Sequence, residues 1–145
     1  MSDFSFEIAG LNELMSRLAQ APVIIEQEMK KAIDATAIFA ERSARALAPH
    51  QTGTLQRSIH ASPAVVTSNN VTAKVGTNIK YARAQEYGTV GMTINSHSRN
   101  GTAFSYRGNI KPKFYMKQGK EQAMPMRDIN LKTAGYNIVK RLGGK

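Results

Sequence analysis

The side chains that could hold a metal ion or catalyse a reaction are few and scattered in this sequence. Three histidines, His50, His60 and His97, stand in turn or strand contexts with no HExxH or HxH arrangement. Cysteine is absent, which excludes disulfides and thiolate metal ligands. A structural role is therefore expected for the histidines, and no metal or other cofactor is predicted.

Carboxylates are equally scarce where a hydrolase would need them. Beyond residue 42 the acids are Glu86, Glu121 and Asp128, too few for a Ser-His-Asp site or a carboxylate pair. The phosphate-binding patterns GxxxxGK[ST] and GxGxxG do not occur. We therefore predict that the protein is not an enzyme. A toxin-like or enzymatic accessory domain is left as a third alternative that no residue cluster supports.

The positive charge is concentrated in the later part of the chain. The formal net charge is +10, yet residues 1–42 hold seven acids and four bases, whereas residues 43–145 hold three acids and sixteen bases. Such a field favours acidic partners, either nucleic acid or a negatively charged protein surface. A plain solubilising role for the surface lysines is the other interpretation.

The chain length and composition are those of one folded domain, expected to span residues 1–145. The first residues include Asp3 and Glu7, where a signal peptide would be basic and then apolar. No later run approaches the length of a membrane-spanning helix. Neither secretion nor membrane association is predicted.

Helical periodicity dominates the first third of the chain. Residues 4–8 alternate apolar and polar types and predict an edge strand, and leucines at 11, 14 and 18 then predict a short helix. Pro22 predicts the start of a second, longer helix that ends near Leu47, because Pro49 disfavours helical geometry at the residue before it. Small alanines on its apolar stripe predict close packing against a sheet.

The middle of the chain predicts strands, turns and a short helix. Residues 55–67 and 71–75 are strand-like and flank a turn at Ser68-Asn69-Asn70, so they predict an antiparallel hairpin. Pro63 predicts an edge position or a bulge in the first strand. A short helix over 81–87, closed by Gly88, follows.

A long connection without helical period spans residues 89–113. A connection of this length predicts a functional element, and we expect a hairpin arm in which residues 92–95 pair with residues 104–107 around a turn containing Asn100-Gly101. Residues 89–120 contain no acid and six bases, namely Arg99, Arg107, Lys111, Lys113, Lys117 and Lys120. The arm is therefore expected to be a positively charged projection.

The end of the chain predicts helix again. Residues 114–123 are expected to be helical, Pro125 to interrupt them, and an apolar stripe to follow at Leu131, Ala134, Ile138 and Leu142. Together these elements predict an α+β fold. An antiparallel sheet would be packed by a long N-terminal helix and a C-terminal helix, with an extended basic hairpin arm.

Glu86 is the only acid between Arg42 and Glu121, and it lies just before the arm. It could pair with a base of its own or a neighbouring copy and fix the root of the arm, or it could be a solvated charge on a short helix. Tyr81 and Tyr87 could stack on bases or partners, or bury the ring and expose the hydroxyl. The predicted oligomer or partner interface consists of Glu86, Tyr87, Thr89, Arg99, Arg107, Lys111 and Lys113.

Four motifs, in order, resemble the tail-component or head-tail joining family of long-tailed bacteriophages. They are an opening Gly-Leu-x-x-Leu, a helix ending in Ala-Pro before Thr-Gly-x-Leu-x-x-Ser-Ile, a Val-Gly-Thr strand before Tyr-Ala and Glu-aromatic-Gly-Thr, and a Pro-x-aromatic. The matching positions are Gly10, Leu11, Leu14, Ala48, Pro49, Thr52, Gly53, Leu55, Ser58, Ile59, Val75, Gly76, Thr77, Tyr81, Ala82, Glu86, Tyr87, Gly88, Thr89, Pro112 and Phe114. The length and polarity of residues 91–110, and Tyr115-Met116 in place of a single apolar anchor, depart from the family pattern.

This resemblance implies a virion protein of the head-tail junction, a neck or tail-completion component assembled in the host cytoplasm. It implies a ring of identical copies with a channel for the genome, six copies being favoured over twelve. The implied partners are other neck and tail proteins, such as an adaptor, stopper, tail terminator or tube, and genomic DNA contacted without sequence specificity. The family has no known enzymatic role.

The competing interpretation is a basic nucleic-acid-associated protein. The charge and the basic arm favour contact with phosphates, yet the sequence has no zinc finger, RNP aromatics or KH loop. Such a protein would bind DNA non-specifically. A gel shift with duplex DNA that is lost steeply with salt, together with monomers in light scattering, would favour this interpretation over the ring.

Overall fold

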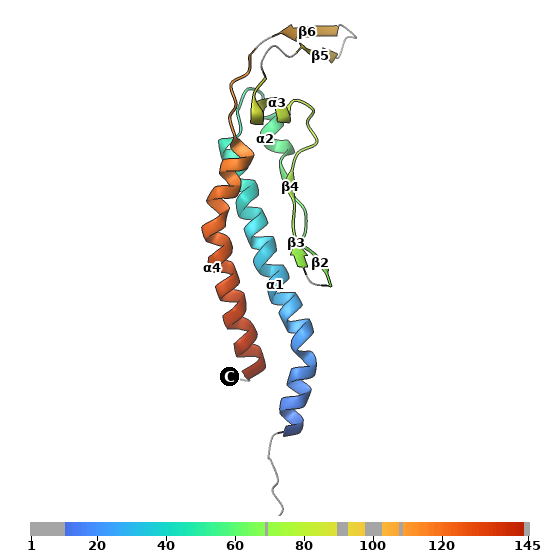
Figure 1. The fold of residues 1–145 in the computed structure, drawn as a ribbon, viewed down its shortest axis with the longest axis vertical. Helices are drawn as coiled ribbons and strands as arrows, with labels where there is room; N and C mark the ends of the chain where they lie inside the picture. The colour runs from blue at the N-terminus through green and yellow to red at the C-terminus, as the bar shows by residue number, and fades with distance from the viewer. Residues whose placement is uncertain (1–10, 69, 90–92, 98–102, 108, 144–145) are drawn as a thin grey trace, which may run out of the picture.

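Two long helices form the shaft of the molecule (Figure 1). The computed structural model describes residues 11–68, 70–89, 93–97, 103–107 and 109–143, so the strand expected at residues 4–8 lies outside the described residues. Helix α1 (Leu11–Leu47) has 37 residues and α4 (Tyr115–Gly143) has 29. The two helices pack side by side, and α1 ends at Leu47 as the sequence predicts.

Both helices continue through a proline at which the sequence predicts a break. Pro22 lies inside α1, where two separate helices are expected, and Pro125 lies inside α4. These two predictions are wrong. A proline removes one backbone hydrogen bond and crowds the preceding turn, but most helical stability in proteins comes from tertiary packing. The face that α1 and α4 share keeps α4 continuous at Pro125, whereas Pro22 lies in an exposed stretch of α1 where the structure shows no packing that explains the continuity.

Small residues allow a close approach of α1 and α4. Ala44 is almost fully buried, and a Cβ added at Gly119 would lie 2.8 Å from the Ala44 backbone nitrogen. Ala37 on α1 and Ala123 on α4 are also buried. At Ala44, then, the alanine stripe of α1 packs against a helix, where the sequence predicts a sheet.

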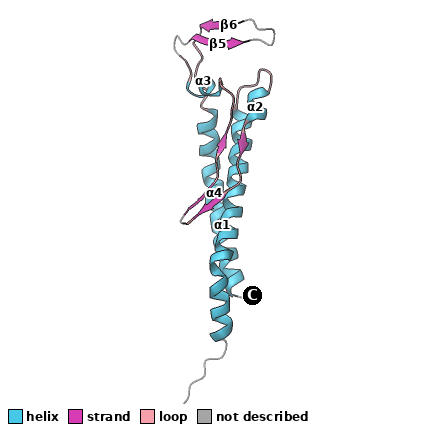
Figure 2. Cartoon of the chain, turned by 90° about the vertical axis from the view of Figure 1, so that its right-hand side faces the viewer, coloured by secondary structure: helices cyan, strands magenta, loops and turns pink. Residues whose placement is uncertain are grey.

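A hairpin of four short strands lies along α1, in front of the helix pair in Figure 2. Antiparallel pairs form between β1 (His60–Ala61) and β4 (Val75–Gly76) and between β2 (Val65–Thr67) and β3 (Asn70–Thr72). Between the two pairs, three residues on the first strand face two on the second, because Ala61 pairs with Val75 and Val65 with Thr72. This extra residue is a β-bulge at 62–64, which confirms the bulge predicted from Pro63.

Carboxylates of α1 hold one edge of this hairpin. Asp34 Oδ1 accepts the backbone N–H of Ala64 at 2.6 Å, and Glu41 Oε2 accepts that of Ala61 at 2.5 Å. Glu41 also pairs with Arg45 one turn further along α1 at 2.9 Å. The edge formed by β1 and the bulge is therefore fastened to the shaft.

Residues 54–58 form a short helix, α2 (Thr54–Ser58), where the sequence predicts a strand. Gly53, with φ +71°, precedes it. Leu55 and Ile59 are four residues apart, so one helical turn brings both to the same side, and both are buried. They join Ala44, Ala48, Ala82 and Tyr115 in the main core cluster. The extended conformation expected from residue 55 is thus replaced by a turn that buries these two side chains.

The arm follows helix α3 (Ala82–Tyr87), which the sequence correctly predicts. Strand β5 (Thr93–His97) pairs antiparallel with β6 (Ala103–Arg107), confirming the predicted hairpin, with Asn95 opposite Ser105. Figure 1 shows this ribbon beyond the ends of α1 and α4. The predicted α+β class is correct, although the described strands form three separate two-stranded sheets.

Candidate functional site at the base of the arm

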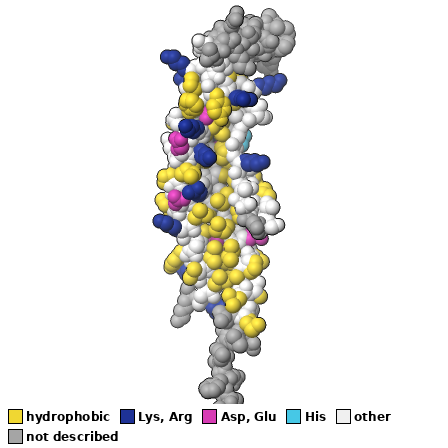
Figure 3. All heavy atoms as spheres, in the orientation of Figure 1, with side chains coloured by type: hydrophobic (Ala, Val, Ile, Leu, Met, Phe, Trp, Pro, Cys, Tyr) yellow, Lys and Arg dark blue, Asp and Glu magenta, His cyan; other side chains and the backbone are white. Residues whose placement is uncertain are grey.

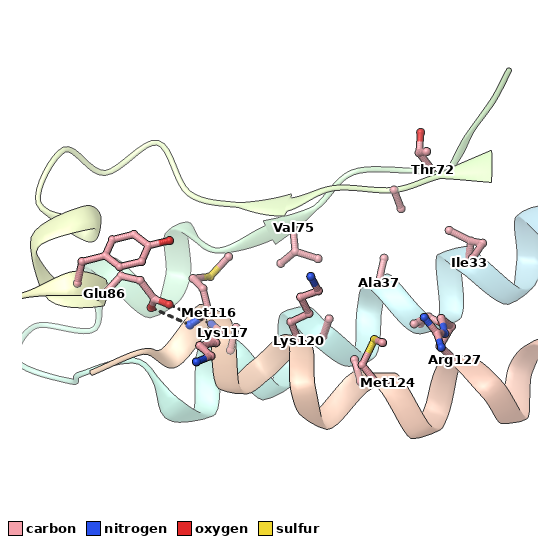
Figure 4. Close-up of a pocket in the computed structure, with 16 residues that line it drawn as sticks. Ile33, Ala37, Thr72, Val75, Glu86, Met116, Lys117, Lys120, Met124 and Arg127 are labelled. Carbon is pink, nitrogen blue, oxygen red and sulfur yellow. Dashed lines mark hydrogen bonds between the residues drawn. The ribbon is translucent and has the colours of Figure 1, made fainter. Parts of the chain in front are cut away.

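The base of the arm is closed by the carboxylate of Glu86 on α3. Its Oε2 accepts the backbone N–H of Met116 at 2.9 Å and its Oε1 that of Lys117 at 3.0 Å (Figure 4). Both amides belong to the first turn of α4, where no helix carbonyl is available to them. Glu86 is only 5% exposed. It therefore caps α4 from a different helix.

This arrangement answers the two interpretations of Glu86 that the sequence leaves open. A solvated charge is excluded, because the side chain is buried. Glu86 does fix the root of the arm, but through main-chain amides in the place of a basic side chain. The positive end of the α4 dipole also favours a carboxylate at this position. The pairing of Glu86 with a basic residue of a neighbouring copy remains a prediction.

Main-chain hydrogen bonds tie together the two chain segments that leave and re-enter the body. Thr89 and Ile110 exchange two N–H to C=O bonds of 3.0 and 3.1 Å. Nearer α4, the N–H of Lys113 donates to Gln85 O at 3.0 Å and that of Phe114 to Glu86 O at 3.1 Å. The arm is thus anchored on both of its segments rather than by a single linker.

Gly88 and Phe114 adopt backbone conformations that this closure requires. Gly88 has φ +75°, and a Cβ at this position would lie 2.6 Å from the Ile110 carbonyl oxygen. Phe114 has φ +50°, which is unfavourable for a bulky residue. Its carbonyl accepts the N–H of Gln118 at 2.8 Å, and Lys117 Nζ lies 5.8 Å from its ring centroid. These contacts and the bond to Glu86 hold Phe114 in place.

Tyr115, the first residue of α4, belongs to the main core cluster. The sequence pattern marked it only as a departure from the family. It is 1% exposed, and its hydroxyl donates to Ala82 O at 3.4 Å. Burial raises the pKa of this tyrosine to about 12, with smaller contributions from Glu86 and Tyr81. The spacing from Pro112 to the aromatic pair Phe114-Tyr115 was the available signal.

The structure brings together only part of the predicted interface. Glu86 and Thr89 are buried within the base of the arm. Tyr87, by contrast, is 67% exposed, so its ring is not buried as the alternative interpretation expects. Lys111 and Lys113 are exposed on the segment that enters α4. Arg107 lies in β6, where only the backbone is described, and Arg99 lies outside the described residues.

A groove of about 620 Å³ lies beside the base of the arm, between the hairpin and α4, with α1 beneath it. Figure 4 shows Val75 from the hairpin and Met116 and Met124 from α4 around this space. Its lining is mainly apolar, and three basic side chains, Lys117, Lys120 and Arg127, also line it. The space-filling view in Figure 3 shows apolar and basic side chains interspersed over the shaft.

Nothing in the described part of the chain has the geometry of a metal centre, since no three His, Asp or Glu side chains gather there. Among the described helices, none combines the length and apolar character that crossing a membrane requires. The described residues form a helical shaft, an anchored arm and a groove.

A comparison with protein families identifies the class of the protein. Residues 12–88, more than half of the chain, match the family model described as "Bacteriophage HK97-gp10, putative tail-component". The chain belongs to this family of phage tail components, and its role is structural rather than catalytic. No curated protein and no solved structure gives a significant match. The matched region ends at Gly88, so it includes Glu86 and stops just before the arm.

Proposed function

We propose that this tail component forms a ring at the junction of the phage head and tail, with a channel through which the genome passes. Six copies per ring are favoured over twelve, since six would match a sixfold tail tube. Its neighbours would be other neck and tail proteins. Membership of a tail-component family supports this role, and the anchored arm supplies a means of contact between molecules.

The observation that carries the proposal is a two-stranded ribbon that stands beyond the helices and is held firmly at its base. An isolated two-stranded hairpin is at best marginally stable in water. A ribbon that projects in this way gains stability when a neighbouring molecule packs against it or extends its sheet. The Thr89–Ile110 pairing and the Glu86 cap would hold the ribbon in a fixed direction for that purpose.

The charges near the ribbon give the proposed contact its chemistry. Lys111 and Lys113 are exposed where the arm joins α4, and Tyr87 is exposed on the other side of its base. An acidic surface on a neighbouring copy or tail protein would be complementary to these lysines. Association should therefore weaken between roughly 50 and 500 mM salt.

Deletion of residues 92–108 tests the proposal. The shortened protein should fold as a monomer with an unchanged helical signal, while ring formation, followed by electron microscopy and light scattering, and head-tail joining in extracts should be lost. A matched pair of double variants separates specific charge from net charge: Lys111→Ser with Lys113→Ser should weaken association, whereas Lys132→Ser with Lys140→Ser, distant on α4, should not. Intact joining by the deletion variant would reject the proposal.

A further inference from the structure

The groove beside the arm borders a strand edge that the hairpin leaves unused. Ser62 N–H donates to Lys74 O at 2.7 Å, and Lys74 N–H donates to Ser62 Oγ at 3.0 Å, so the main-chain groups of Lys74 face β1. Those of Ala73 and Val75, one residue to either side, face the opposite edge, because ladder groups alternate along a strand. Unlike the β1 edge, which Asp34 and Glu41 fasten to α1, this outer edge borders the groove.

Beneath this edge the groove presents a mainly apolar surface. Ala37 and Ala40 of α1 line it from below, and Met116 and Met124 of α4 line it from the far side. Lys117 and Lys120 are exposed basic residues among its lining, and Arg127 is half-buried and paired with Asp128 at 2.8 Å. A strand with one apolar face and some acidic residues would complement both features.

Residues 3–8 of this chain have that pattern. Phe4, Phe6 and Ile8 would share one face of a strand, since side chains alternate, and Asp3 and Glu7 would share the other. Asp3 and Glu7 would stand ~13 Å apart in an extended chain. Lys120 and Arg127, seven residues apart on α4, are separated by ~10 Å along the helix. The acidic and basic pairs are thus similarly spaced.

The segment cannot reach the groove of its own molecule. Along α1, Ile33 lies ~33 Å from Leu11 and Ala37 lies ~39 Å from it, at ~1.5 Å per residue. The seven residues from Leu11 back to Phe4 span at most ~25 Å when fully extended. Any strand that residues 4–8 add to this groove must therefore come from another copy.

We propose that residues 3–8 of one copy bind as an added strand along the outer edge of β3 and β4 of a second copy, filling the groove against α1 and α4. This contact rests on the proposed self-association and deepens it, because it names a donor and an acceptor at a site distinct from the arm. Donor and acceptor lie far apart on each molecule, so the contact is head to tail and can continue from copy to copy.

A peptide titration tests the acceptor. A fluorescent peptide with the sequence of residues 1–10 is added to the full-length double variant Phe4→Asp with Phe6→Asp, whose own segment is disabled. Saturable binding is expected, weakened about tenfold by Lys120→Glu in the same chain. A peptide carrying Phe6→Asp should bind roughly 10- to 100-fold more weakly, whereas the matched Ser5→Asp peptide, altered on the opposite face, should bind nearly as well as the original.

Engineered cysteines test whether the contact lies between copies. The natural chain has no cysteine, so mixing a Phe6→Cys copy with an Ala73→Cys copy of different tag length should give a mixed disulfide-linked dimer on oxidation. A chain that carries both Phe6→Cys and Ala73→Cys should give a ladder of linked copies. An internally linked monomer, absence of the mixed dimer, or peptide binding that is missing or indifferent to Phe6→Asp and Lys120→Glu would each overturn the inference.

These results are separable from those of the ring. If the arm deletion abolishes ring formation but the peptide does not bind, the strand contact fails and the ring proposal stands. If the peptide binds and the mixed dimer forms while the arm deletion leaves joining intact, the arm's proposed role fails and the strand contact stands.

Discussion

The two ends of the helix pair are held together by different physical means. At the end near the arm, Ala44 and Gly119 bring α1 and α4 close together, and the Glu86 carboxylate caps α4 through two buried amides. At the other end, Glu28 of α1 receives hydrogen bonds from Arg141 at 3.0 Å and Asn137 at 3.2 Å of α4, and from Lys31 at 2.9 Å. Close packing fixes the first end, and long polar side chains bridge the second.

The contrast continues in the apolar residues at each end. Tyr115 and Ile59 are fully buried near the arm, whereas Leu18, Val23, Tyr136 and Val139 are all more than half exposed toward the far end. The arm end is therefore a rigid base that can position a projection. The far end depends on charge and solvent conditions, so the two ends should respond differently to mutation and pH.

Gly119→Val should have the largest effect, because it forces α1 and α4 apart at their close approach. The added side chain would meet the backbone of Ala44, which has no room to move away, so we expect the free energy of unfolding to fall by about 3 kcal/mol. Urea denaturation measures the change. Gly135→Ala on the same helix, where a Cβ meets nothing within 4 Å, is the control and should stabilise slightly. Equal effects at both positions would contradict the close approach.

Glu86→Ala should rank second, since it leaves the Met116 and Lys117 amides without their acceptor. Loss of a helix cap of this kind lowers the free energy of unfolding by about 1 to 2 kcal/mol. Glu86→Gln, which keeps one acceptor oxygen, should lose less. Glu121→Ala, at an exposed position on α4, is the matched control and should be near neutral. Hydrogen exchange at the first turn of α4 should quicken only in the Glu86 variants.

Tyr115→Phe should lower the free energy of unfolding at neutral pH by about 1 kcal/mol or less, through loss of the bond to Ala82 O. The larger effect of this substitution should be on the free energy of unfolding at alkaline pH. The pKa of Tyr115 is raised to about 12 from an ordinary value of 10, so the folded state keeps the proton longer than the unfolded state. The wild type should therefore lose stability between pH 10 and about 12 more steeply than Tyr115→Phe. Parallel curves for the two proteins would contradict this.

The far end should weaken in acid, which we expect to be the smallest of these effects. Hydrogen bonds from Lys31 and then from Asn137 hold the pKa of Glu28 below its ordinary value of 4.5, against the opposing effect of burial. A lowered carboxylate pKa gives stability that is present above pH 4.5 and lost as the pH falls through the folded-state pKa. The protection of amides near Arg141, taken relative to the intrinsic exchange rate at each pH, should fall on acidification, and Glu28→Gln should flatten that dependence. An equal response to acid of the amides at the arm end would contradict the proposed difference between the two ends.

The sequence by itself determined the elements that depend on neighbours in the chain. Helical period placed the end of α1 at Leu47, alternation and turn residues placed both hairpins, and Pro63 marked the bulge. The four motifs between Gly10 and Phe114 also identified the family that the comparison confirms. Each of these follows from steric and hydrogen-bonding preferences that act within a few residues.

Tertiary structure alone decided the rest. Continuity through Pro125 depends on packing between helices from opposite ends of the chain, and the turn at 54–58 depends on a core that buries Leu55 and Ile59 together. The role of Glu86 was hidden for the same reason, since its partners lie 30 and 31 residues away. The local sequence pattern indicates where a helix begins, and so which amides lack an acceptor. Only the folded chain brings a distant carboxylate to those amides.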